Sequence, residues 1–473
     1  MTTERSDALV LFGASGDLAR KMVLPALYEL SCDGRLDVPV VGVAASRWDD
    51  EDFRGYARAA VRDLRPEPAR ERLDARLSFV SGDYRDPATY ERLRAALGGA
   101  RRPLLYLAIP PSLFAEVVGR LRHAGLHERA RIAVEKPFGH DLASARALNR
   151  RLRESFPEES VLRVDYFLGL DACLDLLVFR FANVLVDSVW DRAHVARVQV
   201  TMAEDFGVET RGAFYDAVGA VRDVVQNHLL QLVALAAMEP PAAHGAGALR
   251  DEKVKVLRAM RPLRPGDVVR GQYRGYRGER GVAADSDVET YVALRAWIDN
   301  GRWAGVPFYV RTGKRLATTA TELVVELRRP PPGAPDTAAA ERLRVRLSPR
   351  GQVAVGLRTR RAPPGGAWRR GRTTDRAALD LAAGVTELTH DGERSGRGRP
   401  EVVAYARLLD AALSGDPALF VRQDEVEASW RVVDPVLASP PQAEEYEPGS
   451  WGPPGAAKLV RGHRAWQDPP ADA

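Results

Sequence analysis

Short runs of consecutive apolar residues alternate with helix-like stretches through the first third of the chain. Strands that are buried on both faces have this pattern, because neither face needs polar side chains. Residues 18–30 and 113–124 instead carry the apolar spacing of helices. The alternation predicts a doubly wound α/β domain over residues 1–165. Its strands are expected at residues 8–12, 38–44, 104–109 and 131–137.

A different pattern begins at residue 166. Residues 195–201 alternate apolar and polar side chains, as a half-buried strand does, and residues 221–238 predict one long helix. Residues 166–473 are therefore predicted to form a β+α domain with one large mixed, mainly antiparallel sheet. Its further strands are expected near residues 289–298, 306–312, 321–328, 343–348 and 352–358.

Charge and composition argue against a nucleic-acid-binding protein. The formal net charge is only +5, from 69 basic and 64 acidic residues. The densest basic cluster, at residues 358–376, is broken by Pro and Gly, which favours a solvated loop over a continuous basic surface. Loops are also expected at 361–375 and 391–400, and irregular chain in the proline-rich tail beyond residue 440.

Cysteine usage and hydropathy indicate a compartment. The two cysteines, Cys32 and Cys173, are too few for a disulfide framework and are expected to be buried or half-buried thiols. No apolar run approaches the roughly 18 residues of a membrane span, and the N-terminus does not have the pattern of a signal peptide. We therefore expect a cytoplasmic protein without a membrane, metal or nucleic-acid partner.

The turn between the first strand and the next helix is a candidate nucleotide site. Glycine at such a turn lets the backbone approach a pyrophosphate, and the helix N-terminus adds unpaired N–H groups and a partial positive charge. A plain glycine turn is the alternative, because glycine spacing alone is a weak signal. The residues expected to bind the cofactor are Gly13, Ala14, Ser15, Gly16, Asp17 and Leu18.

The end of the second strand bears on the choice between NAD and NADP. An acidic residue there binds the adenosine ribose of NAD, whereas a basic one accommodates the 2′-phosphate of NADP. Here Ala45, Ser46 and Arg47 follow the strand, with no acid among them. Arg47 therefore favours NADP and leaves NAD open, although a solvated surface arginine would look the same in the sequence.

Long motifs in a fixed order resemble the glucose-6-phosphate dehydrogenase family over nearly the whole chain. The clearest are GASGDLARKMVLPALYEL, EKPFGHDLASA, RDVVQNHLLQLVALAAMEPP, WAGVPFYVRTGKRL and LFVRQDEVEASW. The resemblance implies a Rossmann-like domain followed by a β+α domain. It also implies oxidation of a hexopyranose at C1 to a lactone with NAD(P), and a homodimer, or dimer of dimers, assembled through the sheet.

Removing hydride from C1 requires a base that takes the proton of the 1-hydroxyl, and a neutral imidazole suits this near neutral pH. His228 matches the family's base, and Asp165 matches the carboxylate that orients it. From spacing alone, His228 would be interpreted as a buried structural histidine. Asp223 lies five positions earlier, about 140° around an α-helix. We therefore expect it to contact another part of the sugar.

Other family matches carry groups that suit sugar hydroxyls, which both donate and accept hydrogen bonds. Lys136, Glu204, Asp223 and Lys314 match positions that hold the sugar or approach the nicotinamide. The Lys136–Pro137 bond is a candidate cis peptide. Without the resemblance, Glu204 and Lys314 would be interpreted as members of surface ion pairs.

The segment after Asp165 departs from the family, which has Asp-His-Tyr-Leu-Gly-Lys there. Tyr166, Phe167 and Leu170 replace the three usual phosphate contacts, and Thr319 stands where a basic residue is usual. Each lost charge-assisted hydrogen bond weakens binding by about 1.5–3 kcal/mol. We therefore expect a sugar that lacks the 6-phosphate or carries a less charged group there.

Three alternatives stay open at this point. Other arginines, such as Arg211, could replace the lost contacts, so that glucose 6-phosphate remains the substrate. The chain could be a catalytically silent scaffold, although such a protein has no need of Lys136, Asp165, Asp223 and His228 together. The glucose–fructose oxidoreductase group shares a Rossmann domain and a large sheet, but its motif order fits less well.

Overall fold

The computed structural model describes residues 4–64, 67–243, 245–328, 341–360, 383–391, 398–460 and 465–470. The chain forms two compact units, each assembled from separate segments. The first unit comprises Met1–Leu174, Phe214–Pro265 and Arg394–Pro440, and the second comprises Asp175–Ala213, Gly266–Glu393 and Pro441–Ala473. A domain boundary between residues 165 and 166 stays a prediction.

The first unit contains a six-stranded parallel sheet in the order β3-β2-β1-β4-β5-β6. Every residue of β1, β2 and β4 is buried, which explains why these strands are uninterrupted apolar runs. The four predicted strands are confirmed, while β3 and β6 were not recognised because each offers only a short apolar pattern. The strands are β1 (Ala8–Phe12), β2 (Val40–Ala44), β3 (Leu77–Ser81), β4 (Pro103–Leu107), β5 (Arg131–Glu135) and β6 (Val161–Val164).

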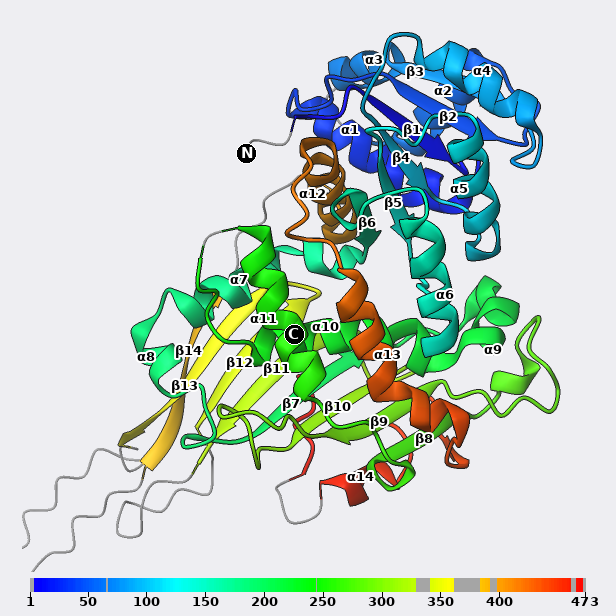
Figure 1. Cartoon of the computed structure of the whole chain (residues 1–473). Helices are drawn as coiled ribbons and strands as arrows, with labels where there is room; N and C mark the ends of the chain where they lie inside the picture. The colour runs from blue at the N-terminus through cyan, green and yellow to red at the C-terminus, as the bar shows by residue number, and fades with distance from the viewer. Residues whose placement is uncertain are drawn as a thin grey trace, which may run out of the picture. The chain divides into compact units, whose positions relative to one another are not determined.

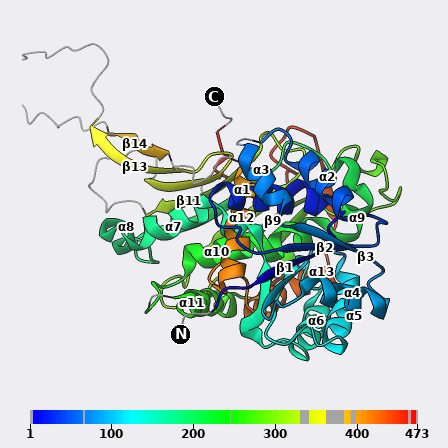
Figure 2. The ribbon, with the colours of Figure 1, turned by 90° about the horizontal axis from the view of Figure 1, so that it is seen from above.

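Helices cover both faces of this sheet, as the two views of the ribbon show (Figures 1 and 2). One face carries η1 (Ala19–Val23), α1 (Leu24–Cys32), α2 (Asp50–Ala60) and α3 (Glu67–Asp74). The other carries α4 (Pro87–Leu97), η2 (Pro111–Leu113), α5 (Phe114–His123) and α6 (Leu142–Arg153). The predicted helices at 18–30 and 113–124 are confirmed, and so is the doubly wound architecture.

More helices complete the first unit. The helix predicted over residues 221–238 is present, but η6 has the wide π pitch and only α10 is α-helical. α12 packs on α1 and η4, and α13 packs on α6, α11 and η6. The bounds are η3 (Glu158–Ser160), η4 (Tyr166–Gly169), α9 (Gly212–Ala220), η6 (Val221–Leu229), α10 (Leu230–Ala237), α11 (Ala246–Ala259), α12 (Pro400–Ser414) and α13 (Gln423–Ala438).

The second unit contains a nine-stranded sheet in the order β14-β13-β12-β11-β7-β10-β9-β8-β15. Two neighbouring pairs, β7 with β10 and β8 with β15, are parallel, and the others are antiparallel. The prediction of one mixed, mainly antiparallel sheet is therefore confirmed. The strands are β7 (Val195–Ala203), β8 (Val268–Tyr273), β9 (Tyr291–Ala296), β10 (Phe308–Gly313), β11 (Ala320–Leu327), β12 (Arg342–Ser348), β13 (Gln352–Arg360), β14 (Ala383–Asp391) and β15 (Ala443–Tyr446).

Short helices accompany this sheet. They are α7 (Asp171–Phe181), which starts in the first unit, α8 (Val184–Ser188), η5 (Glu209–Arg211), η7 (Pro265–Asp267), η8 (Tyr276–Gly278) and α14 (Ala456–Leu459). α14 contacts β8 and β9. The loop predicted at 361–375 lies outside the described residues, and of 391–400 only residues 391 and 398–400 are described.

The prediction of an irregular tail is confirmed only in part, because the tail is short of regular elements but well bonded. Beyond residue 440 the chain adds β15 and α14, and residues 465–470 lie against the second sheet. Gln467 exchanges hydrogen bonds with the Gln199 side chain, through its N–H and its carbonyl. Buried Arg311 lies against Trp451 and Trp466, at 4.7 and 4.8 Å, and donates to Asp468. Proline content alone did not reveal these side-chain partners.

Neither Cys32 nor Cys173 forms a disulfide; the first is half-buried and the second buried, as expected. Within the described ranges, every helix is too short or too polar to cross a bilayer.

Candidate active site

The predicted nucleotide turn requires glycine at its first position. Gly13 follows β1 with φ +81°, and a Cβ there would lie 2.2 Å from the carbonyl oxygen of Ala108. Its N–H donates to Val43 O and to the Tyr84 hydroxyl, both at 2.9 Å. The Gly13 carbonyl accepts from the N–H of Gly16 at 2.9 Å. The backbone therefore folds back tightly where β1 ends, leaving a cradle that no other residue type would fit.

Side chains of neighbouring segments bond to the rest of the turn. Ala14 is fully buried, and the Ser15 Oγ accepts a hydrogen bond from Ser46 at 2.9 Å. The Tyr56 hydroxyl donates to the carbonyls of Ser15 and Gly16. Asp17 is exposed and pairs with Lys21 one turn later, whereas Leu18 packs against the apolar core.

Arg47 is exposed just beyond the end of β2, three residues after Ala44. Within the described part of the chain, its guanidinium has no hydrogen bond or ion pair. The strand end thus has a cation and no acid, and a glycine cradle lies beside it. This combination fits a dinucleotide that carries a 2′-phosphate, as NADP does.

The predicted catalytic pair is assembled. His228 lies on η6 and Asp165 follows β6, and the Nδ1 of the imidazole is 2.5 Å from the Asp165 Oδ1. Both side chains are almost fully buried. Burial by itself would raise the pKa of Asp165, but the charge and hydrogen bond of His228, with Lys136 and a backbone N–H, lower it overall. An ionised Asp165 places the proton of a neutral imidazole on Nδ1 and leaves Nε2 as an acceptor.

Lys136 reaches the other side of the imidazole. Its Nζ lies 3.0 Å from the His228 Nε2 and donates to the backbone carbonyl of Asp223 at 2.8 Å. The Asp223 carboxylate is 3.4 Å from the same Nζ. The Lys136–Pro137 bond is cis, as expected.

The expected separation of Asp223 from His228 is wrong. The angle of about 140° assumed 3.6 residues per turn, whereas η6 is a π-helix whose hydrogen bonds join residues five apart. Positions five apart therefore lie on the same side of the helix, and Lys136 contacts both Asp223 and His228. That Asp223 contacts another part of the sugar stays a prediction. A π turn leaves no signature in the apolar spacing, so the sequence could not reveal it.

Two aromatic rings of η4 enclose the imidazole. Tyr166 meets His228 edge-on, with centroids 5.1 Å apart and planes at 76°, and Phe167 lies over it at 5.5 Å and 27°. Leu170, one residue beyond η4, is 9% exposed. Arg407 of α12 is a cation that contacts this segment, donating to the Gly169 carbonyl and the Asp171 carboxylate.

The remaining predicted residues lie in the second unit. Lys314 donates to the Glu204 carboxylate at 2.6 Å, and its Nζ is 5.1 Å from the centre of the Phe206 ring. Thr319 donates to the Asp205 carboxylate and accepts from the Asp205 N–H. Glu204 and Lys314 thus pair with one another, but Lys314 is buried, so they do not form a surface ion pair. Their contact with a sugar stays a prediction.

A buried carboxylate next to the catalytic pair was missed. Glu135 ends β5 and accepts a hydrogen bond from the Tyr106 hydroxyl at 2.5 Å, and Tyr405 of α12 also bonds to it. A glutamate inside the apolar run RIAVE, directly before Lys136, was the available signal, because buried acids are rare without a partner. The partners themselves come from other elements and could not be read from the sequence.

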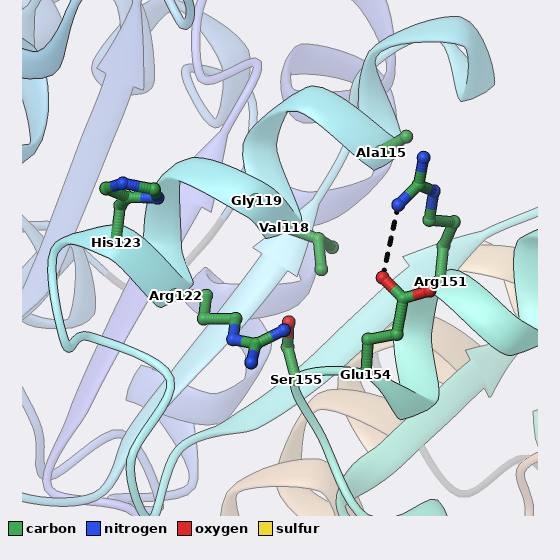
Figure 3. Close-up of a pocket in the computed structure, with 8 residues that line it drawn as sticks. All are labelled: Ala115, Val118, Gly119, Arg122, His123, Arg151, Glu154 and Ser155. Atoms are coloured by element: carbon green, nitrogen blue, oxygen red, sulfur yellow. Dashed lines mark hydrogen bonds and ion pairs between the residues drawn. The ribbon is translucent and has the colours of Figure 1, made fainter.

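A hollow of about 470 Å³ between α5 and α6 contains none of the predicted site residues (Figure 3). Its polar lining includes Arg122, His123 and Ser155, and an exposed ion pair joins Arg151 to Glu154 at 3.2 Å. It contains no buried acid–base pair like that of Asp165 and His228. Among the described residues, no group of three or more His, Cys, Asp or Glu side chains is placed to hold a metal ion.

Comparison with known proteins gives one consistent result. The chain matches the family descriptions "Glucose-6-phosphate dehydrogenase, NAD binding domain" over residues 10–173 and "Glucose-6-phosphate dehydrogenase, C-terminal domain" over residues 177–467. Glucose-6-phosphate 1-dehydrogenase 1 of Mycobacterium tuberculosis is 47% identical, covering 98% of this chain and 97% of its own. A Rhizobium meliloti glucose-6-phosphate 1-dehydrogenase is 37% identical, covering 97% of each chain.

Solved structures agree with these relatives. The crystal structure of glucose-6-phosphate 1-dehydrogenase from Mycobacterium avium has a TM-score of 0.90 and 45% identity, covering 99% of this chain and all of its own. A glucose-6-phosphate dehydrogenase in complex with its substrate glucose-6-phosphate has a TM-score of 0.88 and 32% identity, with the same coverage. The chain therefore belongs to the glucose-6-phosphate dehydrogenase family and is an oxidoreductase.

Proposed function

We propose that the chain oxidises C1 of a hexopyranose to a lactone, with NADP as the favoured cofactor and NAD as the alternative. One observation carries the proposal: a buried imidazole, His228, is oriented by the buried carboxylate of Asp165 at 2.5 Å. A silent scaffold would have no use for this arrangement, since burying a titratable pair costs desolvation energy that apolar side chains would avoid. A wild-type protein inert towards all hexoses would favour the scaffold instead.

In the proposed reaction, the Nε2 of His228 takes the proton of the 1-hydroxyl while hydride leaves C1. Asp165 holds the Nδ1 proton and stabilises the imidazolium that forms. The same Nε2 lone pair is bonded to Lys136 in this structure. Lys136 must therefore release the Nε2 when the sugar binds, and its ammonium keeps two acceptors on Asp223, the carbonyl at 2.8 Å and the carboxylate at 3.4 Å.

An oxidised nicotinamide dinucleotide, when bound, supplies the hydride acceptor. The turn from Gly13 to Leu18 would hold its pyrophosphate, and Arg47 would pair with the 2′-phosphate of NADP. We expect Arg47→Ala to lower kcat/KM for NADP about tenfold and to leave NAD unchanged, because a charge-assisted contact contributes about 1.5–3 kcal/mol. A strong wild-type preference for NAD would contradict the NADP assignment.

At C6 we propose a group that is smaller or less charged than phosphate. Tyr166, Phe167 and buried Leu170 offer no cation along η4, and Arg407 is bound to Gly169 and Asp171. Glu204, Lys314 and Thr319 would then hold neutral sugar hydroxyls. An ordinary glucose 6-phosphate dehydrogenase with a rearranged phosphate site is the second candidate, favoured by the names of the relatives.

Steady-state kinetics on three sugars separates the two candidates. We expect kcat/KM for glucose or 6-deoxyglucose to equal or exceed that for glucose 6-phosphate, measured by the appearance of NAD(P)H. A dominant glucose 6-phosphate activity that inorganic phosphate inhibits competitively would instead identify the ordinary enzyme.

Restoring the family's cation tests the C6 assignment directly. Leu170→Lys should raise kcat/KM for glucose 6-phosphate by about ten- to a hundredfold and leave 6-deoxyglucose little changed, because one charge-assisted contact returns. Leu170→Met is the matched control, since it keeps an apolar side chain of similar size. Equal responses of both variants to both sugars would show that position 170 does not face C6.

We further propose that the protein is a homodimer or a dimer of dimers located in the cytoplasm. The resemblance supports the assembly, and the two cysteines without a disulfide support a reducing compartment. Light scattering of the purified chain measures its mass, and a monomer at micromolar concentration would contradict the assembly.

A further inference from the structure

A buried carboxylate and two buried tyrosines form a network behind the catalytic pair. Glu135 at the end of β5 accepts from the Tyr106 hydroxyl of β4 at 2.5 Å and also bonds to Tyr405 of α12. All three side chains are at least nine-tenths buried. A buried tyrosine hydroxyl needs a partner, so Glu135 fixes two rings that come from different elements.

Tyr405 connects this network to His228 through a second ring. Tyr405 stacks on Tyr166, with centroids 5.9 Å apart and planes within 9° of parallel. Tyr166 in turn meets the His228 imidazole edge-on at 5.1 Å. A continuous chain of contacts therefore runs from the Glu135 carboxylate through two aromatic rings to His228. Its members lie on β5, α12, η4 and η6, all within the first unit.

We propose that Glu135 is a positioning residue of the reaction, which holds Tyr405 so that Tyr166 stays edge-on against His228. The proposal rests on the proposed function, in which His228 is the base. It also explains why Tyr is tolerated at position 166: its ring is fixed on one face by Tyr405 and meets the imidazole at its edge. Tyr166 thereby forms part of the wall that a sugar would meet.

The charge state of Glu135 links this network to pH. Facing it are Tyr106 from β4, Tyr405 from α12, Lys136 beside it in sequence and Asp165 at the end of β6. Burial raises the pKa of Glu135 to about 7, although the tyrosine hydrogen bonds and Lys136 act in the opposite direction. A protonated carboxyl brings an extra O–H donor into a group that already has two donors. Protonation should therefore loosen Tyr405 and, through it, Tyr166.

Kinetic variants test the network. Assays use whichever of glucose, 6-deoxyglucose and glucose 6-phosphate the wild type oxidises fastest. Glu135→Gln should remove an inflection near neutral pH from the kcat profile and lower kcat on the order of tenfold, with little change in KM, because the base is misplaced rather than the sugar released. Tyr106→Phe should move that inflection to higher pH, since it removes a hydrogen bond that favours the ionised carboxylate.

Two variants at position 405 separate packing from hydrogen bonding. Tyr405→Phe keeps the stacked ring but removes the hydroxyl that Glu135 holds, so it should lose about as much kcat as Glu135→Gln. Tyr405→Leu removes the stack as well and should match or exceed that loss. Tyr276→Phe removes a hydroxyl from a buried tyrosine of the second unit and is the control. Melting temperatures and near-ultraviolet circular dichroism confirm that each variant is folded.

A second measurement does not depend on turnover. The ring ¹⁵N signals of His228, in protein labelled on its histidines, should shift in Glu135→Gln and Tyr405→Leu and stay unchanged in Tyr276→Phe. Unmoved ring signals together with wild-type kcat and pH profile in folded Glu135→Gln would overturn the positioning role. A wild type that oxidises none of the three sugars would instead remove the proposed function, and the ring signals alone would then decide on the network.

Discussion

At the scale of single residues, the site depends on how one imidazole is surrounded. Asp165 fixes the Nδ1 of His228, Lys136 occupies the Nε2, and two aromatic rings limit its tilt. Each contact excludes water or fixes a proton, so the ring enters the reaction already in its reactive tautomer. Changes to these neighbours should therefore act on kcat more than on KM.

Asp165→Asn should lower kcat by about a hundredfold or more, because an amide neither fixes the required tautomer nor stabilises imidazolium. The pKa of Asp165 is lower in the folded state than in the unfolded chain, so its ionisation stabilises the fold at any pH above the unfolded pKa. That stabilisation is lost as the pH falls through the folded pKa. The variant should therefore lose less stability than the wild type on acidification. Asp410→Asn, which alters an acid paired with Arg5 and Arg35, is the control and should keep wild-type kcat.

Glu135 gives a stability prediction of the opposite sign. The pKa of Glu135 in the folded state, about 7, lies above the ordinary 4.5. The stability that its protonated form contributes is therefore complete below pH 4.5 and is lost as the pH rises through 7. At about 1.4 kcal/mol per pH unit, that loss amounts to about 3 kcal/mol. Glu135→Gln should avoid it, so urea denaturation at pH 8 and pH 5 should show a smaller difference for the variant. An identical pH dependence would contradict the raised pKa.

At the scale of elements, the turn after β1 shows how one backbone position determines a binding site. Gly13 combines φ +81° with a carbonyl only 2.2 Å from where a Cβ would lie. A side chain must therefore either displace the chain just after β4 or unfold the turn, and both spoil the cradle for a pyrophosphate.

Gly13→Ala should cost at least about 1–3 kcal/mol of stability and weaken NADP binding more than tenfold, measured by thermal unfolding and calorimetric titration. Gly34→Ala is the matched control, because Gly34 also has a positive φ of 69° but has open space around its Cα. Equal losses in both variants would mean that backbone strain, not the clash with Ala108, sets the cost.

The elements also show where sequence patterns succeed and fail. The buried strands β1, β2, β4 and β5 follow from uninterrupted apolar runs, and the pairing of His228 with Asp165 followed from motif resemblance. The π pitch of η6 did not, since hydrogen bonding between residues five apart changes no residue type. Glu135, Tyr106 and Tyr405 are scattered over three elements, and only tertiary packing brings them together.

At the scale of the whole molecule, stability depends on segments that are distant in sequence. In the second unit, residues 465–470 supply partners to polar side chains of β7 and β10, among them Gln199 and Arg311. Both side chains are 2% exposed or less, so losing these partners would leave buried polar groups unsatisfied.

Truncation before residue 465 should therefore lower the free energy of unfolding by about 3 kcal/mol or more, because a buried arginine loses its carboxylate and carbonyl partners. Arg274→Ala, which removes two exposed ion pairs, should cost much less, because solvent screens exposed pairs. A truncated chain as stable as the full one in urea denaturation would show that the tail contributes little.

The wide pitch of η6 has a consequence for how such a protein can change over generations. In the π pitch five residues make slightly more than one turn, as four residues do in an α-helix. The loss of one codon between Asp223 and His228 could therefore be absorbed by a change to α pitch, with the imidazole kept on the same side of the helix. The extra residue is thus one that a lineage could gain or lose in a single event while the buried helix α10 keeps its packing.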